Sequence, residues 1–170
     1  ETGPGPVLSD ADSHAITSEL TARALASDWV VLAGSLPRGV NTDWYCDLIS
    51  AVRAAAPQAR IAVDTSDAPM QAIGENLNSA APDLIKPNGL ELGQLTGTDG
   101  RELEDQAARG EYAGVVRAAR DVVKQGIAEV LVTLGGAGAV LVTADGAWAA
   151  TPPPATVKST VGAGDAALAG

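Results

Sequence analysis

The chain has 170 residues, 46% of them hydrophobic and 19% charged, which indicates a packed globular core rather than a disordered chain. A formal net charge of −10 without long basic runs argues against nucleic acid as a partner. With a single cysteine, Cys46, and a single histidine, His14, the chain has no intrachain disulfide and no structural zinc site. We expect a cytoplasmic protein that does not enter a membrane, with Cys46 buried and His14 on the surface.

The first third of the chain predicts two helices around one strand. Ser9, followed by two acidic residues, is typical of a helix start, and Ile16 and Leu20 continue that helix with an apolar stripe. Residues 28–34 form a continuous apolar run, which predicts a buried strand. Residues 44–55 repeat apolar side chains at helical spacing until Pro57 ends the pattern.

The rest of the chain alternates strands and helices. Further strands are expected at residues 60–66, 83–88 and 129–136, and a hairpin turning at Asp145-Gly146 follows. Helices are expected at residues 70–77, after Asn88 and before Gly126. This order predicts an α/β fold, a doubly wound and mostly parallel sheet with Rossmann-like three-layer architecture and an antiparallel hairpin extension. In such sheets ligands bind beyond the carboxyl ends of the strands.

The last twelve residues read STVGAGDAALAG, residues 159–170. Gly162, Ala163 and Gly164 can expose consecutive backbone N–H groups to an anion at a helix start. Asp165 would repel a phosphate, but it suits a base that takes a proton from an attacking hydroxyl. Taken alone, the string is weak, and an ordinary glycine turn with a first-turn acid is the better interpretation of it.

Two further patterns carry chemistry. In KPNGLEL, Asn88 and Glu91 stand at i and i+3, where they can act on phosphate and magnesium or form a helix cap with its acidic partner. TLGGAGAV imitates a dinucleotide-binding turn, yet the residues from Val140 onward continue as a strand, which disfavours a dehydrogenase. A glycine corner against which a nucleotide rests remains open, and no P-loop string occurs.

Together these motifs resemble the PfkB (ribokinase-like) family of carbohydrate kinases. The matching stretches, in the family's order and spacing, are LAGSLPRGV, KPNGLEL, VTLGGAGAVLVT and STVGAGDAALAG, and they cover essentially the whole chain. The strings GSLPRGV, VDTSD and IKPN are most similar to its sugar-phosphate branch. The resemblance implies a ribokinase-like fold and ATP- and Mg²⁺-dependent phosphoryl transfer to a hydroxyl of a sugar phosphate. Fructose 1-phosphate is the first candidate, with tagatose 6-phosphate and fructose 6-phosphate as alternatives.

The resemblance also implies a role for each matching residue. Asp165 would be the base, and Gly162, Ala163 and Gly164 would form the anion hole for the transferred phosphate. Ser35 would face the sugar phosphate, and Glu91 would hold magnesium through water. The expected ATP-side residues are Lys86, Asn88, Glu91, Thr133, Gly135 and Gly138.

Two departures from the family qualify this expectation. Ser159 stands where many relatives carry an aspartate, which puts activation by a monovalent cation in doubt. Family members are roughly twice as long, so residues 1–170 are expected to be a single partial kinase domain, truncated at both ends and inactive alone. Adenosine or another sugar as acceptor, and a non-catalytic nucleotide-binding module, remain alternatives. The full-length protein is expected to be a homodimer.

Overall fold

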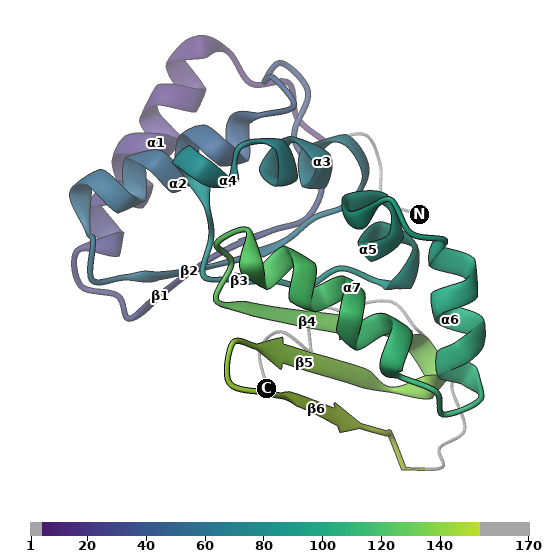
Figure 1. Ribbon diagram of the computed structural model, residues 1–170. Coiled ribbons are helices and arrows are strands. Elements are labelled where there is room, and N and C mark those ends of the chain that lie inside the picture. Colours follow the sequence, from purple (N-terminus) through teal and green to yellow (C-terminus); the bar gives the residue numbers. More distant parts are fainter. Residues whose placement is uncertain (1–4, 154–170) are drawn as a thin grey trace. The chain divides into compact units, whose positions relative to one another are not determined.

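The computed structural model describes residues 5–153, which divide into two compact units (Figure 1). The N-terminal unit extends to Pro82 and the C-terminal unit begins at Asp83. Each unit combines helices with strands, as the alternating sequence pattern predicts. No helix in the described part of the chain has the length and apolar character that a membrane crossing requires.

The N-terminal unit is built on two parallel strands, β1 and β2. They run in register from the pair Trp29 and Arg60 to the pair Ala33 and Asp64. Helix α2 contacts α1, α3 and α4 of the same unit. The elements are α1 (Asp10–Ala24), β1 (Trp29–Ala33), α2 (Trp44–Ala55), β2 (Arg60–Asp64), α3 (Asp67–Glu75) and α4 (Leu77–Ala80).

Helix α1 begins where its sequence signal places it. The Ser9 side chain accepts a hydrogen bond from the Asp12 amide, and the Asp12 carboxylate accepts one from the Ser9 amide at 2.9 Å. This reciprocal cap satisfies N–H groups that have no partner inside the helix. The predicted apolar stripe is less covered than expected, since Ile16 is 40% exposed and Ala24 is the one fully buried residue of this helix.

Helix α2 supplies much of the core of this unit. Its buried face carries Tyr45, Cys46, Leu48, Ile49 and Val52. The prediction of a buried Cys46 is therefore confirmed, and burial, assisted by two nearby carboxylates, raises the pKa of its thiol. The prediction of an exposed His14 is confirmed as well.

Strand β1 differs from the prediction of a strand buried on both faces. Val30 and Leu32 are buried, whereas Val31 is 53% exposed and Trp29 is 40% exposed. The Arg60 guanidinium lies 4.2 Å from the centre of the Trp29 ring and covers part of it. An unbroken apolar run does not show which face of a strand is covered by other elements. In the structure of residues 5–153, the face of β1 that carries Trp29 and Val31 is partly exposed.

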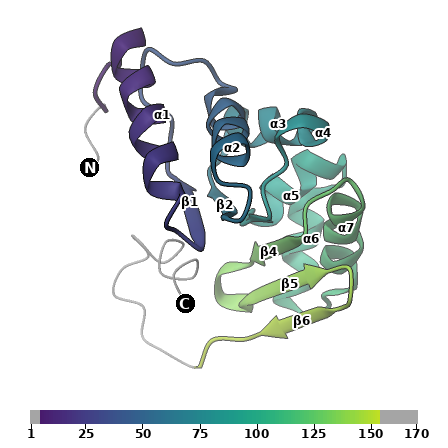
Figure 2. The ribbon, with the colours of Figure 1, turned by 90° about the vertical axis from the view of Figure 1, so that its left-hand side faces the viewer.

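The C-terminal unit joins one parallel strand pair to an antiparallel extension, whose strands β4, β5 and β6 can be followed in Figure 2. Strand β3 pairs in parallel with β4, which pairs antiparallel with β5, and β5 pairs antiparallel with β6. The elements are β3 (Leu84–Ile85), α5 (Gly89–Thr96), α6 (Gly100–Ala108), α7 (Ala113–Lys124), β4 (Glu129–Thr133), the 3₁₀ turn η1 (Gly135–Ala137), β5 (Ala139–Thr143) and β6 (Ala147–Ala150).

Helix α7 contacts β4 and β5, and the strands bury alternate valines. Gly126, with φ of 120°, follows this helix as predicted. The expected hairpin is present, because the Thr143 amide donates to the Gly146 carbonyl at 3.0 Å. Several boundaries differ. The strand expected at residues 129–136 ends at Thr133 and is followed by η1, and the strand expected at residues 60–66 ends at Asp64. The strand expected at residues 83–88 shortens to Leu84–Ile85, and the helix expected at residues 70–77 becomes α3 and α4, divided at Asn76.

Candidate active site

The first part of the candidate site is the turn that follows β1. Gly34, with φ of 96°, ends the strand and places Ser35 on the surface. The Gly34 carbonyl accepts hydrogen bonds from the Tyr45 and Thr65 hydroxyls, each at 3.0 Å. Burial, together with the charge of Asp64, raises the pKa of Tyr45, so this phenol stays a donor at neutral pH. Two side chains from separate elements thus hold the residue before Ser35.

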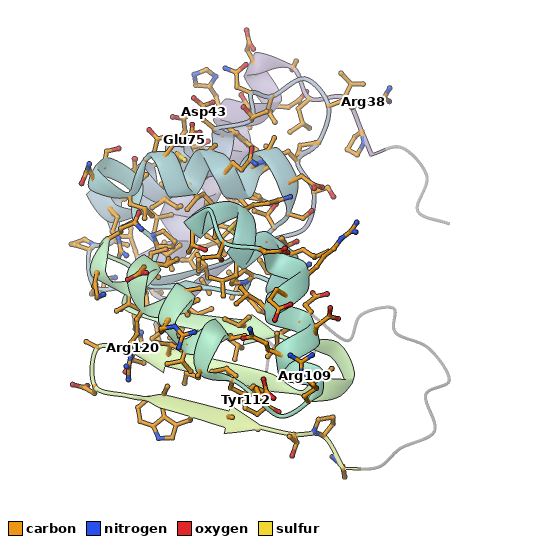
Figure 3. All side chains as sticks on the ribbon, turned by 45° about the vertical axis from the view of Figure 1, so that its right-hand side comes forward. Arg38, Asp43, Glu75, Arg109, Tyr112 and Arg120 are labelled. Carbon is orange, nitrogen blue, oxygen red and sulfur yellow. The ribbon has the colours of Figure 1, made fainter. Side chains whose placement is uncertain are left out.

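The loop that begins with Ser35 is also anchored farther along. The Leu8 amide donates to the Arg38 carbonyl at 2.8 Å, and Val7 forms a parallel bridge with Arg38. At Gly39, with φ of 94°, a Cβ atom would overlap the Leu8 carbonyl oxygen. Arg38 itself is exposed on this loop (Figure 3). The loop therefore has a defined course between β1 and α2.

A pocket of about 260 Å³ opens at the carboxyl ends of β1 and β2, within the N-terminal unit. Its volume lies just below the roughly 300–1,000 Å³ that small-molecule sites usually offer. The sequence analysis selected Ser35 alone from this region. The structure adds polar residues from a second segment, Ser66 and Asp67, whose proximity to Ser35 cannot be predicted from the sequence because they lie about 30 residues away along the chain. The lining residues are Ser35, Leu36, Val40, Thr42, Ser66, Asp67 and Pro69.

In the C-terminal unit, Asn88 and Glu91 form a reciprocal cap at the start of α5. The Asn88 amide donates to the Glu91 carboxylate, and the Glu91 amide donates to the Asn88 side-chain oxygen, both at 2.8 Å. Both side chains are half-buried. Of the two interpretations that their spacing left open, the helix cap is present in this structure.

Lys86 lies just before this cap, between β3 and Asn88. It is 7% exposed. In the described part of the chain, Lys86 and Thr65 are the two polar or charged residues that are buried. Lysine is almost never so buried unless its charge interacts with another group. A lysine ammonium is a charged partner for phosphate oxygens that reach it.

The glycine corner after β4 lies beside the start of α5. Thr133 forms a parallel bridge with Asn88, and its amide donates to the Pro87 carbonyl at 3.0 Å. The structure therefore brings together Asn88, Glu91 and Thr133, although more than 40 residues separate the two segments. Beyond Thr133 the chain turns through η1, and the Leu134 amide donates to the Gly138 carbonyl at 2.8 Å.

The corner needs glycine at two positions. Gly135 has φ of 54° and Gly138 has φ of 95°, both in the left-handed region. At Gly138 a Cβ atom would also overlap the Ala150 carbonyl oxygen of β6. Because β5 leaves this corner antiparallel to β4, it does not open a helix, which confirms that it is no dinucleotide-binding turn.

Tyr112 is a residue of this corner that sequence reasoning missed. Its hydroxyl donates to the Ala137 carbonyl at 2.8 Å, across 25 residues of sequence. Tyr112 stands at the turn between α6 and α7, the turn that begins with Arg109 (Figure 3). It ties that turn to η1, but a tyrosine ahead of a helix gives no local signal of such a contact.

The predicted base Asp165 and the predicted anion hole, Gly162, Ala163 and Gly164, lie outside the described residues. Within residues 5–153, no three His, Cys, Asp or Glu side chains gather as a metal site would require. Glu91 as a single carboxylate suits Mg²⁺, which commonly keeps its waters and binds one or two carboxylates plus substrate phosphates. The residues present therefore fit the predicted water-mediated magnesium contact.

The comparisons with known proteins identify the family. Residues 7–170 match the pfkB family of carbohydrate kinases, and this chain belongs to that family. The 1-phosphofructokinase of Rhodobacter capsulatus is 41% identical over 168 residues, covering 98% of this chain and 48% of the relative. That of Bacillus subtilis is 33% identical over 99% of this chain and 50% of the relative. The chain thus spans about half the length of these curated relatives.

Solved structures agree with this assignment. A mutant of Escherichia coli phosphofructokinase-2 matches with a TM-score of 0.80 at 30% identity, over 98% of this chain and 50% of that one. The same enzyme in complex with fructose-6-phosphate matches with a TM-score of 0.74 at 30% identity, with the same coverage. The expected ribokinase-like α/β fold class is confirmed.

Proposed function

We propose that the protein containing this chain transfers a phosphoryl group from ATP to a hydroxyl of a sugar phosphate, and that fructose 1-phosphate is the acceptor. Fructose 1,6-bisphosphate and ADP would be the products. The observation that carries the proposal is the match of residues 7–170 to the pfkB family of carbohydrate kinases. The curated relatives named 1-phosphofructokinase, at 33–41% identity, favour this acceptor.

The C-terminal unit is proposed to hold the nucleotide. Lys86 would contact a phosphate of ATP, and Thr133, Gly135 and Gly138 would line the corner beneath the nucleotide. Asn88 would orient a phosphate while still capping α5, since an amide side chain has donors besides its oxygen. These residues come from the end of β3, the start of α5 and the end of β4, which the bridge between Asn88 and Thr133 joins.

Magnesium, held through water by Glu91, would supply the positive charge that transferring phosphate oxygens need. Asp165 would take the proton of the acceptor hydroxyl as that oxygen attacks the phosphorus. The amides of Gly162, Ala163 and Gly164 would bind the equatorial oxygens of the transferring group. Ser35, in the N-terminal unit, would contact the acceptor.

The experiment uses the full-length gene product that contains these residues. Asp165→Asn should lower kcat by about 100- to 10,000-fold, the usual contribution of a general base, while the Tm stays close to wild type. Asp145→Asn is the matched control, because Asp145 is an exposed carboxylate whose turn accepts Asn-Gly equally well. Near-normal turnover by Asp165→Asn would overturn the assignment of the base.

A second acceptor, fructose 6-phosphate, is favoured by one observation. A structure of Escherichia coli phosphofructokinase-2 in complex with fructose-6-phosphate matches this chain at 30% identity. Steady-state kinetics with fructose 1-phosphate, fructose 6-phosphate and tagatose 6-phosphate decide between the acceptors. We expect the highest kcat/KM with fructose 1-phosphate, and a higher value for either other sugar would reassign the substrate.

The alternative of a non-catalytic nucleotide-binding chain makes a different prediction. Calorimetric titration of the 170-residue chain with Mg-ATP would then give binding without ADP formation, and the full-length protein would also lack turnover. Under our proposal, the full-length protein turns over. Light scattering on the full-length protein tests the expected homodimer.

A further inference from the structure

Asp67 has an unusual backbone conformation. Among residues 5–153 it is the single residue other than glycine with positive φ, at 53°. This left-handed conformation crowds the Cβ atom of an L-residue against its own carbonyl, and glycine adopts it without that crowding. Aspartate is among the few residues that tolerate this region, so a carboxylate can be kept at this position.

The Asp67 side chain lines the pocket at the carboxyl ends of β1 and β2. It is exposed, and the Ser66 hydroxyl donates to its Oδ2 atom at 3.3 Å. Three hydroxyl-bearing residues share the pocket with it, Ser35, Thr42 and Ser66, and none of the described lining residues is lysine or arginine. The pocket wall thus combines one negative charge with groups that can either donate or accept hydrogen bonds.

This chemistry selects one part of a sugar phosphate. An ionised carboxylate is an acceptor with no donor of its own, so it binds a ligand hydroxyl. The same charge repels a phosphate, and no cation among the described lining residues offsets that repulsion. The hydroxyl-bearing part of an acceptor therefore fits this pocket, and its phosphate does not.

We propose that Asp67 is a specificity-determining residue, which accepts a hydrogen bond from a sugar hydroxyl and turns the hydroxyl-bearing part of the acceptor toward Ser35. The inference rests on the proposed function. It adds how the acceptor is oriented in the pocket and assigns that orientation to Asp67. The Ser66 hydroxyl donates to this carboxylate, and both residues line the pocket.

Two variants separate the charge from the backbone. Asp67→Asn removes the charge and keeps a side chain that tolerates the left-handed region, whereas Asp67→Gly removes the side chain and relieves the backbone. Asp43→Asn is the matched control. Asp43, labelled in Figure 3, is an exposed carboxylate at the start of α2 that makes no side-chain cap and is not among the lining residues of the pocket. All are made in the full-length protein.

We expect both Asp67 variants to raise KM for fructose 1-phosphate about 10-fold or more, the value of a hydrogen bond to a charged group, with kcat changed less than about twofold. KM for ATP and the inhibition constant of inorganic phosphate should stay unchanged, as should every constant of Asp43→Asn. An unchanged acceptor KM would overturn the proposal and leave Asp67 a turn residue. A lower KM would also overturn it, since the phosphate would then face the carboxylate.

Failure of the proposed function would look different. In that case the wild-type protein would phosphorylate none of the three sugar phosphates, and calorimetric titration with fructose 1-phosphate would replace the kinetics. Binding that weakens in Asp67→Asn would support the pocket without the reaction. Absence of binding to the wild-type protein would overturn both.

Discussion

The Asn88 and Glu91 side chains each accept a hydrogen bond from the other residue's backbone amide, at the same distance of 2.8 Å. The two residues proposed to act on phosphate and magnesium are therefore also the residues that start α5. A cap restricts the rotamers of both side chains before any ligand arrives, so their functional orientation needs less ordering on binding.

This double role predicts that stability and activity can be separated at Glu91. Glu91→Gln retains a side chain that completes the cap, so the free energy of unfolding should change by less than about 1 kcal/mol. The charge proposed for magnesium is lost, and kcat should fall at least about 10-fold. Urea denaturation and steady-state kinetics on the full-length protein measure the two effects.

Asn88→Ala is the complementary variant. It removes the cap itself and should lower the free energy of unfolding by about 1 kcal/mol. Equal losses of stability in Glu91→Gln and Asn88→Ala would contradict the separation, because the charge would then be needed for the helix rather than for the reaction.

Tyr112 should affect the nucleotide side of the reaction. Tyr112→Phe removes the hydrogen bond to the Ala137 carbonyl, worth about 1 kcal/mol, and should raise KM for ATP about fivefold by loosening η1. The control is Tyr45→Phe, which removes a hydroxyl from Gly34 in the other unit. It should leave KM for ATP unchanged, and similar ATP constants for both variants would argue against a positioning role for Tyr112.

The glycine corner offers a stability test with its own internal control. Gly138→Ala places a Cβ atom against Ala150 at φ of 95°, and it should cost about 2 kcal/mol or more. Gly136→Ala, two residues earlier, meets open space and should be neutral or slightly stabilising. Thermal unfolding of both variants checks this, and equal Tm values would show that the corner tolerates a side chain.

The cap of α1 predicts a pH dependence. Hydrogen bonds from the Ser9 side chain and amide lower the pKa of Asp12 below its ordinary value of 3.8. A lowered folded-state pKa stabilises the fold above the unfolded-state value, and this stability is lost as the pH falls through the folded-state value. Asp12→Asn should therefore lower the Tm at pH 7, and the difference from wild type should disappear in acid below pH 3.8.

Asp10→Asn serves as the comparison, because it removes a carboxylate from the same first turn of α1 without touching the Ser9 contact. We expect a smaller Tm change at neutral pH than with Asp12→Asn. A Tm deficit of Asp12→Asn that persists in strong acid, at about pH 2, would show that shape, rather than charge, matters at this position.

Sequence reasoning succeeded where the physical cause is local. Ser9 with Asp12, Asn88 with Glu91, and Gly126 after α7 are signals carried by neighbouring residues, and the structure has each of them in place. The local signal at Asn88 and Glu91 could not decide between a cap and a ligand site, because both need the same two side chains at the same spacing.

Contacts between distant residues were beyond such reasoning. Tyr112 reaches Ala137 across 25 residues, and Asp67 shares a pocket with Ser35 from the next strand end. The exposure of Val31 depends on which elements pack against β1, and the apolar sequence of β1 alone does not predict this. The base proposed at Asp165 rests on the motif and the family, since it lies outside the described residues.

The Gly34 carbonyl accepts hydrogen bonds from two hydroxyls, those of Tyr45 and Thr65. The turn before Ser35 is therefore held by two hydrogen bonds, either of which can remain when the other is lost. In Tyr45→Phe or in Thr65→Val, the Gly34 carbonyl oxygen still accepts one hydrogen bond from the remaining hydroxyl. In the double variant it accepts neither. A double-mutant cycle should therefore give a loss larger than the sum of the single losses. Substitutions can accumulate at one of these two positions without moving Ser35, provided that the other hydroxyl is kept.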